Sequence, residues 1–206
     1  MNQTIITDIT QGLTTAFIDH TVSSNLAYRP QFVSNNYKEG RKVISSIEDE
    51  LLSCEQFAIS VAFITMSGIT PLLQTLKELE KRGIPGRILT TDYLTFSDPK
   101  ALRKLEEFSN LHVKMYVTDQ TEEGFHTKGY IFKKEEMYRI IVGSSNMTLR
   151  ALTVNREWNT RIVSTEQGEY AQSVLTEFED LWNSPQAVEF EQFIDSYTEN
   201  YTRNKI

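Results

Sequence analysis

The chain is organised around the stretch FHTKGYIF, residues 125–132, and the stretch IIVGSSN, residues 140–146. Each is rich in β-branched and aromatic residues and predicts a strand. The charged run KKEE at 133–136 lies between them and predicts a solvated turn. Two strands joined by such a turn pair in an antiparallel way. The sequence therefore predicts a β-hairpin at the centre of the fold.

Four polar side chains on this hairpin suit the chemistry of a phosphate ester. Because side chains alternate between the two faces of a strand, His126 and Lys128 share a face, and so do Ser144 and Asn146. Antiparallel pairing can bring Ser144 and Asn146 beside His126. The set supplies a nucleophile, a cation and two neutral hydrogen-bond donors. We therefore expect a phosphate site here.

These spacings resemble the signature of the phospholipase D superfamily, which is His-x-Lys, then Gly-Ser-x-Asn, then a downstream Glu. The matching residues are His126-x-Lys128, Gly143-Ser144-x-Asn146 and Glu157. The stretch from Ser45 to Trp182 is similar to the single-motif nucleases of that superfamily. It is most similar to the phospholipase D-like domain at the N-terminus of bacterial DEAD/DEAH-type helicases, through the blocks FHTKGYIF, GSSNMT and NREWN. The resemblance implies a nuclease acting on DNA, in a protein that continues into a helicase.

Two features depart from the family pattern or compete with it. The acidic residue expected five positions after the lysine is Lys133 here, and the turn is longer than usual. The alternative pair His112-x-Lys114, with Asp119 five residues further on, matches the front half of the signature better. No Gly-Ser-x-Asn follows it at a suitable distance. We therefore expect His112 and Lys114 to be ordinary residues of a half-buried strand.

Strands and helices alternate along the rest of the chain. Strand, helix and strand with short loops imply parallel pairing, so we expect an α/β fold with a mixed, largely parallel β-sheet flanked by helices. Trp158 and Trp182 are expected to anchor the core. The further predicted elements are helices at 40–52, 69–82, 99–108, 166–182 and 186–201, and strands at 57–64, 87–91, 111–117 and 157–163.

The same patterns predict three segments. Residues 1–35 have weak periodicity and are expected to form an N-terminal arm. Residues 36–185 are the expected phospholipase D-like domain. Residues 186–206 are expected to be a C-terminal helix that leads into a further domain of a longer parent protein.

Charge and composition limit the partners. The net charge is −7, which argues against indiscriminate binding to nucleic acid. Residues 126–161 nevertheless hold seven basic and three acidic residues, a charge of +4 against −11 elsewhere. The single Cys54 cannot form an internal disulfide, and neither an apolar run of membrane-spanning length nor a basic start typical of a signal peptide is present. We expect a cytoplasmic protein that binds no membrane.

The residue types suggest a mechanism without a metal or another cofactor. A neutral imidazole of His126 can attack phosphorus, while Lys128, Ser144 and Asn146 stabilise the charge on the phosphoryl oxygens. We expect Gly143, Arg150 and Arg156 to contact the substrate. Near the motif, the sequence offers no cluster of carboxylates or of His and Cys ligands at metal spacing.

The second half of the reaction needs a second acid and base. The superfamily takes a second histidine from a second motif, and this chain has one complete motif. The resemblance therefore implies a homodimer that brings two copies of His126 together. Glu157 is expected to fix the tautomer of a His126, unless it forms an ion pair with Arg156 or Arg161.

Two functions stay open on the sequence alone. The first is a metal-independent phosphodiesterase that cleaves nucleic acid through a phosphohistidine. The second is a non-catalytic module that keeps the phosphate pocket for nucleic-acid binding or dimerisation. Hydrolysis of lipids is less favoured, because no amphipathic or acylation signal is present.

Overall fold

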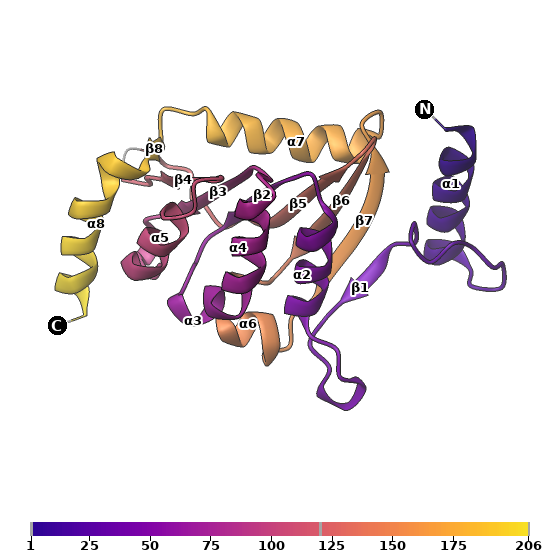
Figure 1. The fold of residues 1–206 in the computed structure, drawn as a ribbon, viewed down its shortest axis with the longest axis horizontal. Helices are drawn as coiled ribbons and strands as arrows, with labels where there is room; N and C mark the ends of the chain where they lie inside the picture. Colours follow the sequence, from indigo (N-terminus) through magenta and orange to yellow (C-terminus); the bar gives the residue numbers. More distant parts are fainter. Residues whose placement is uncertain (1, 120, 206) are drawn as a thin grey trace.

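A computed structural model describes residues 2–119 and 121–205 of the chain. The outermost residues of the predicted arm and of the predicted C-terminal segment, Met1 and Ile206, lie outside the described residues. Within the described residues, eight strands form one sheet in the order β1-β7-β6-β5-β2-β3-β4-β8 (Figure 1). The predicted α/β class with a mixed sheet is confirmed.

The parallel part of the sheet is its middle. Strand β2 pairs in parallel with β3, and β3 with β4, whereas the other neighbouring strands pair in an antiparallel way. The sheet is therefore less parallel than the sequence suggested. The strands are β1 (Gln31–Val33), β2 (Gln56–Val61), β3 (Gly86–Thr91), β4 (Leu111–Tyr116), β5 (Lys128–Lys134), β6 (Met137–Gly143), β7 (Asn159–Thr165) and β8 (Ala187–Glu189).

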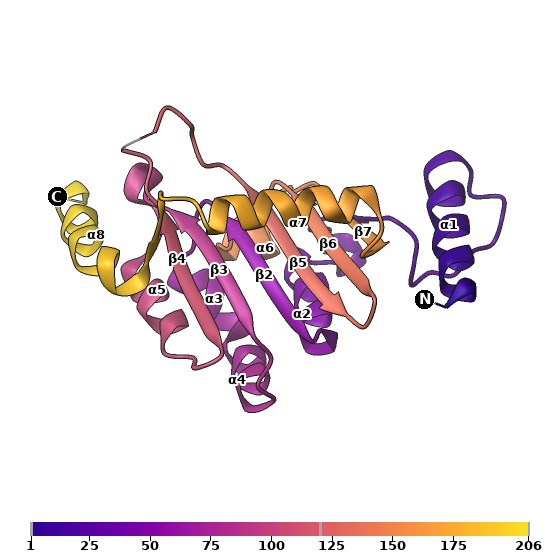
Figure 2. The ribbon, with the colours of Figure 1, turned by 90° about the horizontal axis from the view of Figure 1, so that it is seen from above.

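Helices cover both faces of the sheet unequally. Helices α2, α4 and α5 lie on one face, and the long α7 crosses the other (Figures 1 and 2). The larger apolar core lies on the first face and is built on residues such as Ile47, Ile59 and Leu102. The α-helices are α1 (Gln3–Ile18), α2 (Val43–Ser53), α3 (Met66–Ile69), α4 (Leu73–Lys81), α5 (Pro99–Glu106), α6 (Leu149–Thr153), α7 (Glu169–Trp182) and α8 (Phe190–Asn204).

The helix predicted at 69–82 is broken into pieces. A short α3 is followed by the 3₁₀ turn η2 (Thr70–Leu72) before α4 begins. Pro71 has no amide hydrogen to continue an α-helix from the preceding turn, which explains the break. Two further 3₁₀ turns are η1 (Tyr37–Glu39) and η3 (Tyr93–Thr95).

Two short strands at the sheet edges were absent from the sequence prediction. Strand β1 lies in the predicted arm and pairs with β7, and β8 lies at the start of the predicted C-terminal helix and pairs with β4. Each spans three residues, too few for an alternating pattern to be recognised. The arm is thus partly built into the sheet, whereas α1 stands beyond the β1–β7 edge (Figure 2).

The hairpin predicted from the sequence lies inside the sheet. Strands β5 and β6 pair with Tyr130 opposite Ile141, and β5 also pairs with β2. The hairpin turn contains Glu135, whose φ of 54° is left-handed. No helix among the described residues is both long enough and apolar enough to cross a membrane.

Candidate functional site

His126 lies in the loop just before β5, not in a strand as expected. The neighbouring Thr127 holds this loop to β2, because its carbonyl accepts a hydrogen bond from Ala62 N at 3.1 Å and its hydroxyl lies 2.6 Å from Ser60 Oγ. The His126 ring is exposed and lies edge-on to the ring of Phe63, with centroids 6.4 Å apart. Within the part of the chain that the structure describes, this ring makes no hydrogen bond.

Asn146 is bonded to the backbone of Phe63. Its Oδ1 accepts a hydrogen bond from Phe63 N at 3.0 Å, and Met147 N donates to Phe63 O at 3.0 Å. Phe63 therefore connects the backbone of the Asn146 segment with the ring of His126. Because Oδ1 is engaged, the NH₂ group of Asn146 is the part left to donate to a ligand.

Ser144 is held firmly by the residues that precede β7. Its hydroxyl donates to the carboxylate of Glu157 and accepts a hydrogen bond from Trp158 N at 3.0 Å. Its amide donates to Trp158 O at 3.1 Å. These bonds fix the hydroxyl of Ser144 and place the buried Glu157 directly behind it.

Lys128 begins β5 and supplies the positive charge. Its Nζ donates to the carbonyl of His126 at 3.0 Å, which places the ammonium beside the His126 backbone. Burial lowers the pKa of Lys128 below its usual value, and the nearby Glu157 carboxylate partly offsets this effect. A partly desolvated cation acts more strongly on an anionic ligand than one in bulk water does.

Buried polar residues below the site support it, and sequence reasoning missed them. Tyr130 is fully buried, donates to Ser145 O at 2.9 Å, and has a raised pKa because of burial and of the Glu157 carboxylate. Asn159 bonds Ser145 through both ends of its amide, at 3.2 Å to the backbone nitrogen and 2.9 Å to the hydroxyl. In the sequence, the polar residues Glu157 and Asn159 stand on either side of the aromatic Trp158. This alternation was the pattern that could have indicated a buried polar pair.

Gly143 ends β6 against β7 and leaves no room for a side chain. A Cβ at this position would lie 2.2 Å from Trp158 O and 2.5 Å from Asn159 Cα. The absence of a side chain is therefore explained by close packing of two backbones. This packing does not itself indicate a contact between Gly143 and a substrate, so that contact stays a prediction.

The predicted basic region divides into two groups. Arg139 and Arg161 bind the buried Glu50 of α2, so their charges serve the fold. Arg150 on α6 and Arg156 before Glu157 are exposed and belong to none of the ion pairs found among the described residues. Arg150 and Arg156 are thus accessible to an anionic ligand, and their contact with a substrate stays a prediction.

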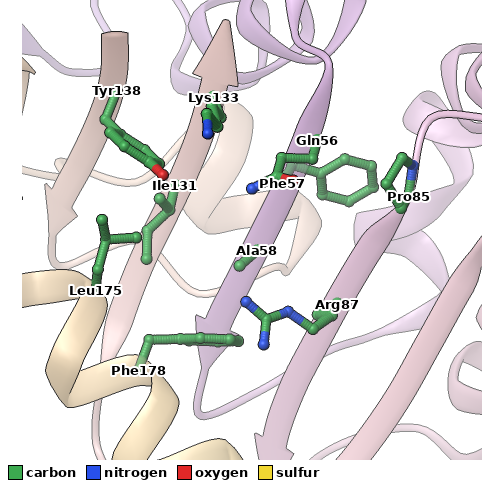
Figure 3. Close-up of a pocket in the computed structure, with 10 residues that line it drawn as sticks. All are labelled: Gln56, Phe57, Ala58, Pro85, Arg87, Ile131, Lys133, Tyr138, Leu175 and Phe178. Atoms are coloured by element: carbon green, nitrogen blue, oxygen red, sulfur yellow. The ribbon is translucent and has the colours of Figure 1, made fainter. Parts of the chain in front are cut away.

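Lys133, the departure from the family signature, lies at the opposite end of β5 from the site. It is five positions along the strand from Lys128, a distance of about 17 Å. Its Nζ pairs with Glu166 at 2.7 Å, and this bond raises its pKa. Lys133 and Tyr138 line a cavity of about 220 Å³, which Leu175 and Phe178 of α7 also line. Figure 3 shows these side chains. Residue 133 therefore cannot contact a phosphate held at His126.

The competing pair His112 and Lys114 lies on β4, on the far side of β2 and β3 from the hairpin. Both side chains bind Glu189 of β8, His112 through Nε2 at 2.5 Å and Lys114 through Nζ at 3.1 Å. The motif residues of β6 are remote from this pair. Its contacts hold the sheet edge together.

The prediction for Trp158 was wrong, whereas that for Trp182 holds. The Trp182 side chain is buried against Phe178, but Trp158 is 75% exposed. Strand alternation explains the difference, because Glu157 and Asn159 occupy the buried positions on either side of Trp158.

Glu157 and His126 are not hydrogen-bonded to each other among the described residues. The Glu157 carboxylate is engaged by Ser144 instead, and the ion pairs proposed with Arg156 or Arg161 are not among those formed in residues 2–119 and 121–205. In these same ranges no three His, Cys, Asp or Glu side chains gather as metal ligands.

A mostly apolar cavity of about 460 Å³ opens beside the site, under α7. Lys128 and Thr127 lie at its polar edge, and Val142, Val174 and Leu181 form its apolar wall. The site is therefore continuous with space that could take an uncharged part of a ligand.

This arrangement, with a histidine and a lysine at the start of β5 and a serine and an asparagine just after the end of β6, accompanies a family-level match. The family described as "Cardiolipin synthase, PLD-like domain" matches residues 48–182, well over half of the chain. This chain belongs to the phospholipase D-like family. Members of the superfamily hydrolyse or transfer phosphodiesters. No curated protein matches the sequence.

Solved structures show the same fold at low sequence identity. NucT from Helicobacter pylori aligns with a TM-score of 0.60 at 16% identity, over 79% of this chain and 99% of NucT. Nuc from Salmonella typhimurium, a phospholipase D family member, aligns with a TM-score of 0.58 at 19% identity, over 79% and 99%. Phosphatidylserine synthase from Haemophilus influenzae aligns with a TM-score of 0.58 at 16% identity, over 86% of this chain and 45% of the synthase.

Proposed function

We propose that this phospholipase D-like chain is a phosphodiesterase that cleaves nucleic acid, DNA above all, through a phosphohistidine on His126. One observation carries the proposal. The exposed ring of His126 makes no hydrogen bond among the described residues, the ammonium of Lys128 lies at the His126 carbonyl, and Asn146 is held at Phe63, whose ring contacts that of His126. A nucleophile kept free beside fixed donors suits attack on a phosphodiester.

In the first step, an imidazole nitrogen forms a bond to phosphorus and the bond from phosphorus to the leaving oxygen breaks. The leaving oxygen takes a proton from an acid. In the second step, water attacks the phosphohistidine, its proton passes to a base, and the bond between phosphorus and nitrogen breaks. In both steps, Lys128 and the NH₂ of Asn146 stabilise the negative charge on the phosphoryl oxygens, the lysine by its charge and the amide by hydrogen bonds. Neither step requires a metal ion.

A homodimer would supply the missing acid and base. The chain has three histidines, and His112 is bound to Glu189 at the other side of the sheet, while His20 lies in the arm. Neither can protonate a leaving group at His126. We therefore propose that His126 of a second copy does so, across a two-fold axis. From the resemblance of FHTKGYIF, GSSNMT and NREWN to helicase-associated domains, we further propose that this activity belongs to a DNA repair or restriction setting, beside a helicase.

Trapping of the adduct tests the chemistry. An end-labelled oligonucleotide is incubated with the protein in excess EDTA and quenched at alkaline pH, where phosphohistidine persists. We expect label on His126, and none in His126→Ala. The control is His112→Ala, which removes an exposed, ion-paired histidine and should keep the label. A requirement for Mg²⁺, or equal losses in both variants, would overturn the mechanism.

Mixing tests the shared site. Increasing amounts of His126→Ala are exchanged into the wild-type protein, and sedimentation follows the assembly. If both copies contribute a histidine to each site, activity falls more steeply than the wild-type fraction. A linear fall, or a monomer with full activity, contradicts the dimer. Salt-dependent binding of oligonucleotide without turnover favours a non-catalytic binding module instead.

A further inference from the structure

An exposed aromatic pair lies next to the candidate site. Trp158 is 75% exposed and Phe32 is 58% exposed, and their rings meet edge to face with centroids 5.9 Å apart. Leaving two large aromatic side chains in water forfeits the free energy that their burial would give. Such a pair at the edge of a polar site is typical of a binding surface.

The pair is coupled to the site through the backbone. The amide of Trp158 donates to Ser144 Oγ, and its carbonyl accepts from Ser144 N. Phe32 of β1 pairs with Thr160 of β7, two residues beyond Trp158, so both aromatic side chains project from the same face of the sheet. The indole of Trp158 therefore projects from a residue that is bonded directly to Ser144 of the candidate site.

A groove at the β1 edge of the sheet has Phe32 among its lining residues, together with residues of α2. It has a volume of about 540 Å³ and is lined by both apolar and polar groups. Lys42 belongs to none of the ion pairs of the described residues, whereas Arg41 binds Glu39. Asp49 also lines this groove and carries a charge opposite to that of Lys42. Its other polar lining residues include Ser34, Ser45 and Ser46.

We propose that Trp158 and Phe32 form a stacking platform for an unpaired nucleobase next to the scissile phosphate. The strand then continues into the groove, where Lys42 and the hydroxyl groups contact its backbone. This inference rests on the proposed function, in which the site holds a nucleic-acid phosphodiester.

The chemistry of the surroundings favours this occupant over a second copy of the chain. A pair of exposed aromatic rings with cations and hydroxyl groups nearby suits a ligand that combines flat rings with phosphates. Arg156 precedes Trp158 and Lys42 lies on the groove, and a polyanion satisfies both. In a duplex, the faces of a base are covered by its neighbours in the stack. The platform therefore selects single-stranded nucleic acid, or a strand end whose bases are unpaired.

Fluorescence offers a direct measurement, because the two tryptophans differ in exposure. Trp182 is 6% exposed, so quenching by a stacked base reports on Trp158. The cleavage-deficient His126→Ala protein is titrated with a single-stranded oligonucleotide, with its duplex form, and with an oligomer of abasic sugar phosphates. We expect strong quenching by the single strand alone.

Variants then measure the contribution of the platform. Trp158→Ala should bind the single strand about 5- to 150-fold more weakly, whereas Trp158→Phe should keep part of the affinity. Phe17→Ala, which removes an exposed aromatic residue from α1, is the matched control and should change nothing.

Three results decide the matter. Unchanged single-strand affinity in Trp158→Ala overturns the platform. The platform is also overturned if the wild-type protein is a dimer, Trp158→Ala is a monomer, and the loss of single-strand affinity matches the loss of dimer. That result would assign the aromatic pair to contact between copies. Base-dependent quenching without cleavage of any substrate supports the platform and contradicts the proposed phosphodiesterase, so the two proposals fail separately.

Discussion

The hydroxyl of Ser144 donates a hydrogen bond to the carboxylate of Glu157, and this contact orders the candidate site within a single chain. The carboxylate also lies near Lys128 and Tyr130, whose pKa values it influences. Glu157 therefore has a role that does not require direct contact with His126. It orients the serine and holds the lysine in its charged form.

This role predicts a change in the pH profile of Glu157→Gln. Burial already lowers the pKa of Lys128, and the Glu157 charge raises it. Removal of that charge should lower the pKa further, so that Lys128 loses its proton at a lower pH. The alkaline limb of the activity profile should therefore move to lower pH. The profile of the oligonucleotide cleavage rate measures this.

The control for Glu157→Gln is Glu166→Gln, which removes a carboxylate that pairs with Lys133 at the other end of β5. Its alkaline limb should coincide with that of the wild-type protein. A limb that stays in place in Glu157→Gln, or moves equally in both variants, would show that the carboxylate does not govern Lys128.

A second prediction concerns Gly143. A methyl group there would lie 2.2 Å from Trp158 O, so the β6 end and the β7 start must separate. We expect Gly143→Ala to lower the free energy of unfolding by about 1–3 kcal/mol and the cleavage rate by roughly 10²-fold, since Ser144 shifts with the backbone. Urea denaturation and initial rates measure the two effects. Gly124→Ala, with no atom within 4 Å of its new Cβ, should alter neither.

Much of the site was predictable because it is encoded in local spacing. His-x-Lys and Gly-Ser-x-Asn identified the two chain segments that meet, and the hairpin placed them together. Their backbone conformation was not predictable. His126 and Asn146 leave the strands because Thr127 and Asn146 bond to residues 62 and 63 after β2, which lie far away in the sequence. Periodicity carries no information on such bonds.

The fold shows the same division. Strands with continuous apolar runs, such as β2 and β3, were predicted within a few residues. The edge strands β1 and β8 were missed, because three residues acquire strand geometry only through the neighbour that they pair with. Trp158 was placed in the core because large aromatic residues usually are. Only the burial of Glu157 and Asn159 shows why it points outward.

A third prediction concerns stability. Glu50 is buried on α2 and holds Arg161 at 2.9 Å and Arg139 at 3.6 Å, and so fastens the helix to β6 and β7. Glu50→Ala leaves two largely buried cations without a counter-charge and should lower the free energy of unfolding by about 3–5 kcal/mol. Chemical denaturation measures the loss. Asp49→Ala, an exposed neighbour on the same helix, should stay within about 0.5 kcal/mol.

The last prediction addresses Lys133, where the superfamily signature has an acidic residue. Because this position lies about 17 Å along β5 from Lys128, restoring the acid should not restore or raise activity. Lys133→Asp exchanges the pair with Glu166 for two like charges at the surface, which should change the free energy of unfolding by no more than about 1 kcal/mol. Initial cleavage rates should stay within about twofold of wild type, whereas Lys128→Ala should lose nearly all activity. If Lys133→Asp instead raised the rate tenfold, residue 133 would influence the site through the strand, and the departure from the signature would mark a weakened enzyme.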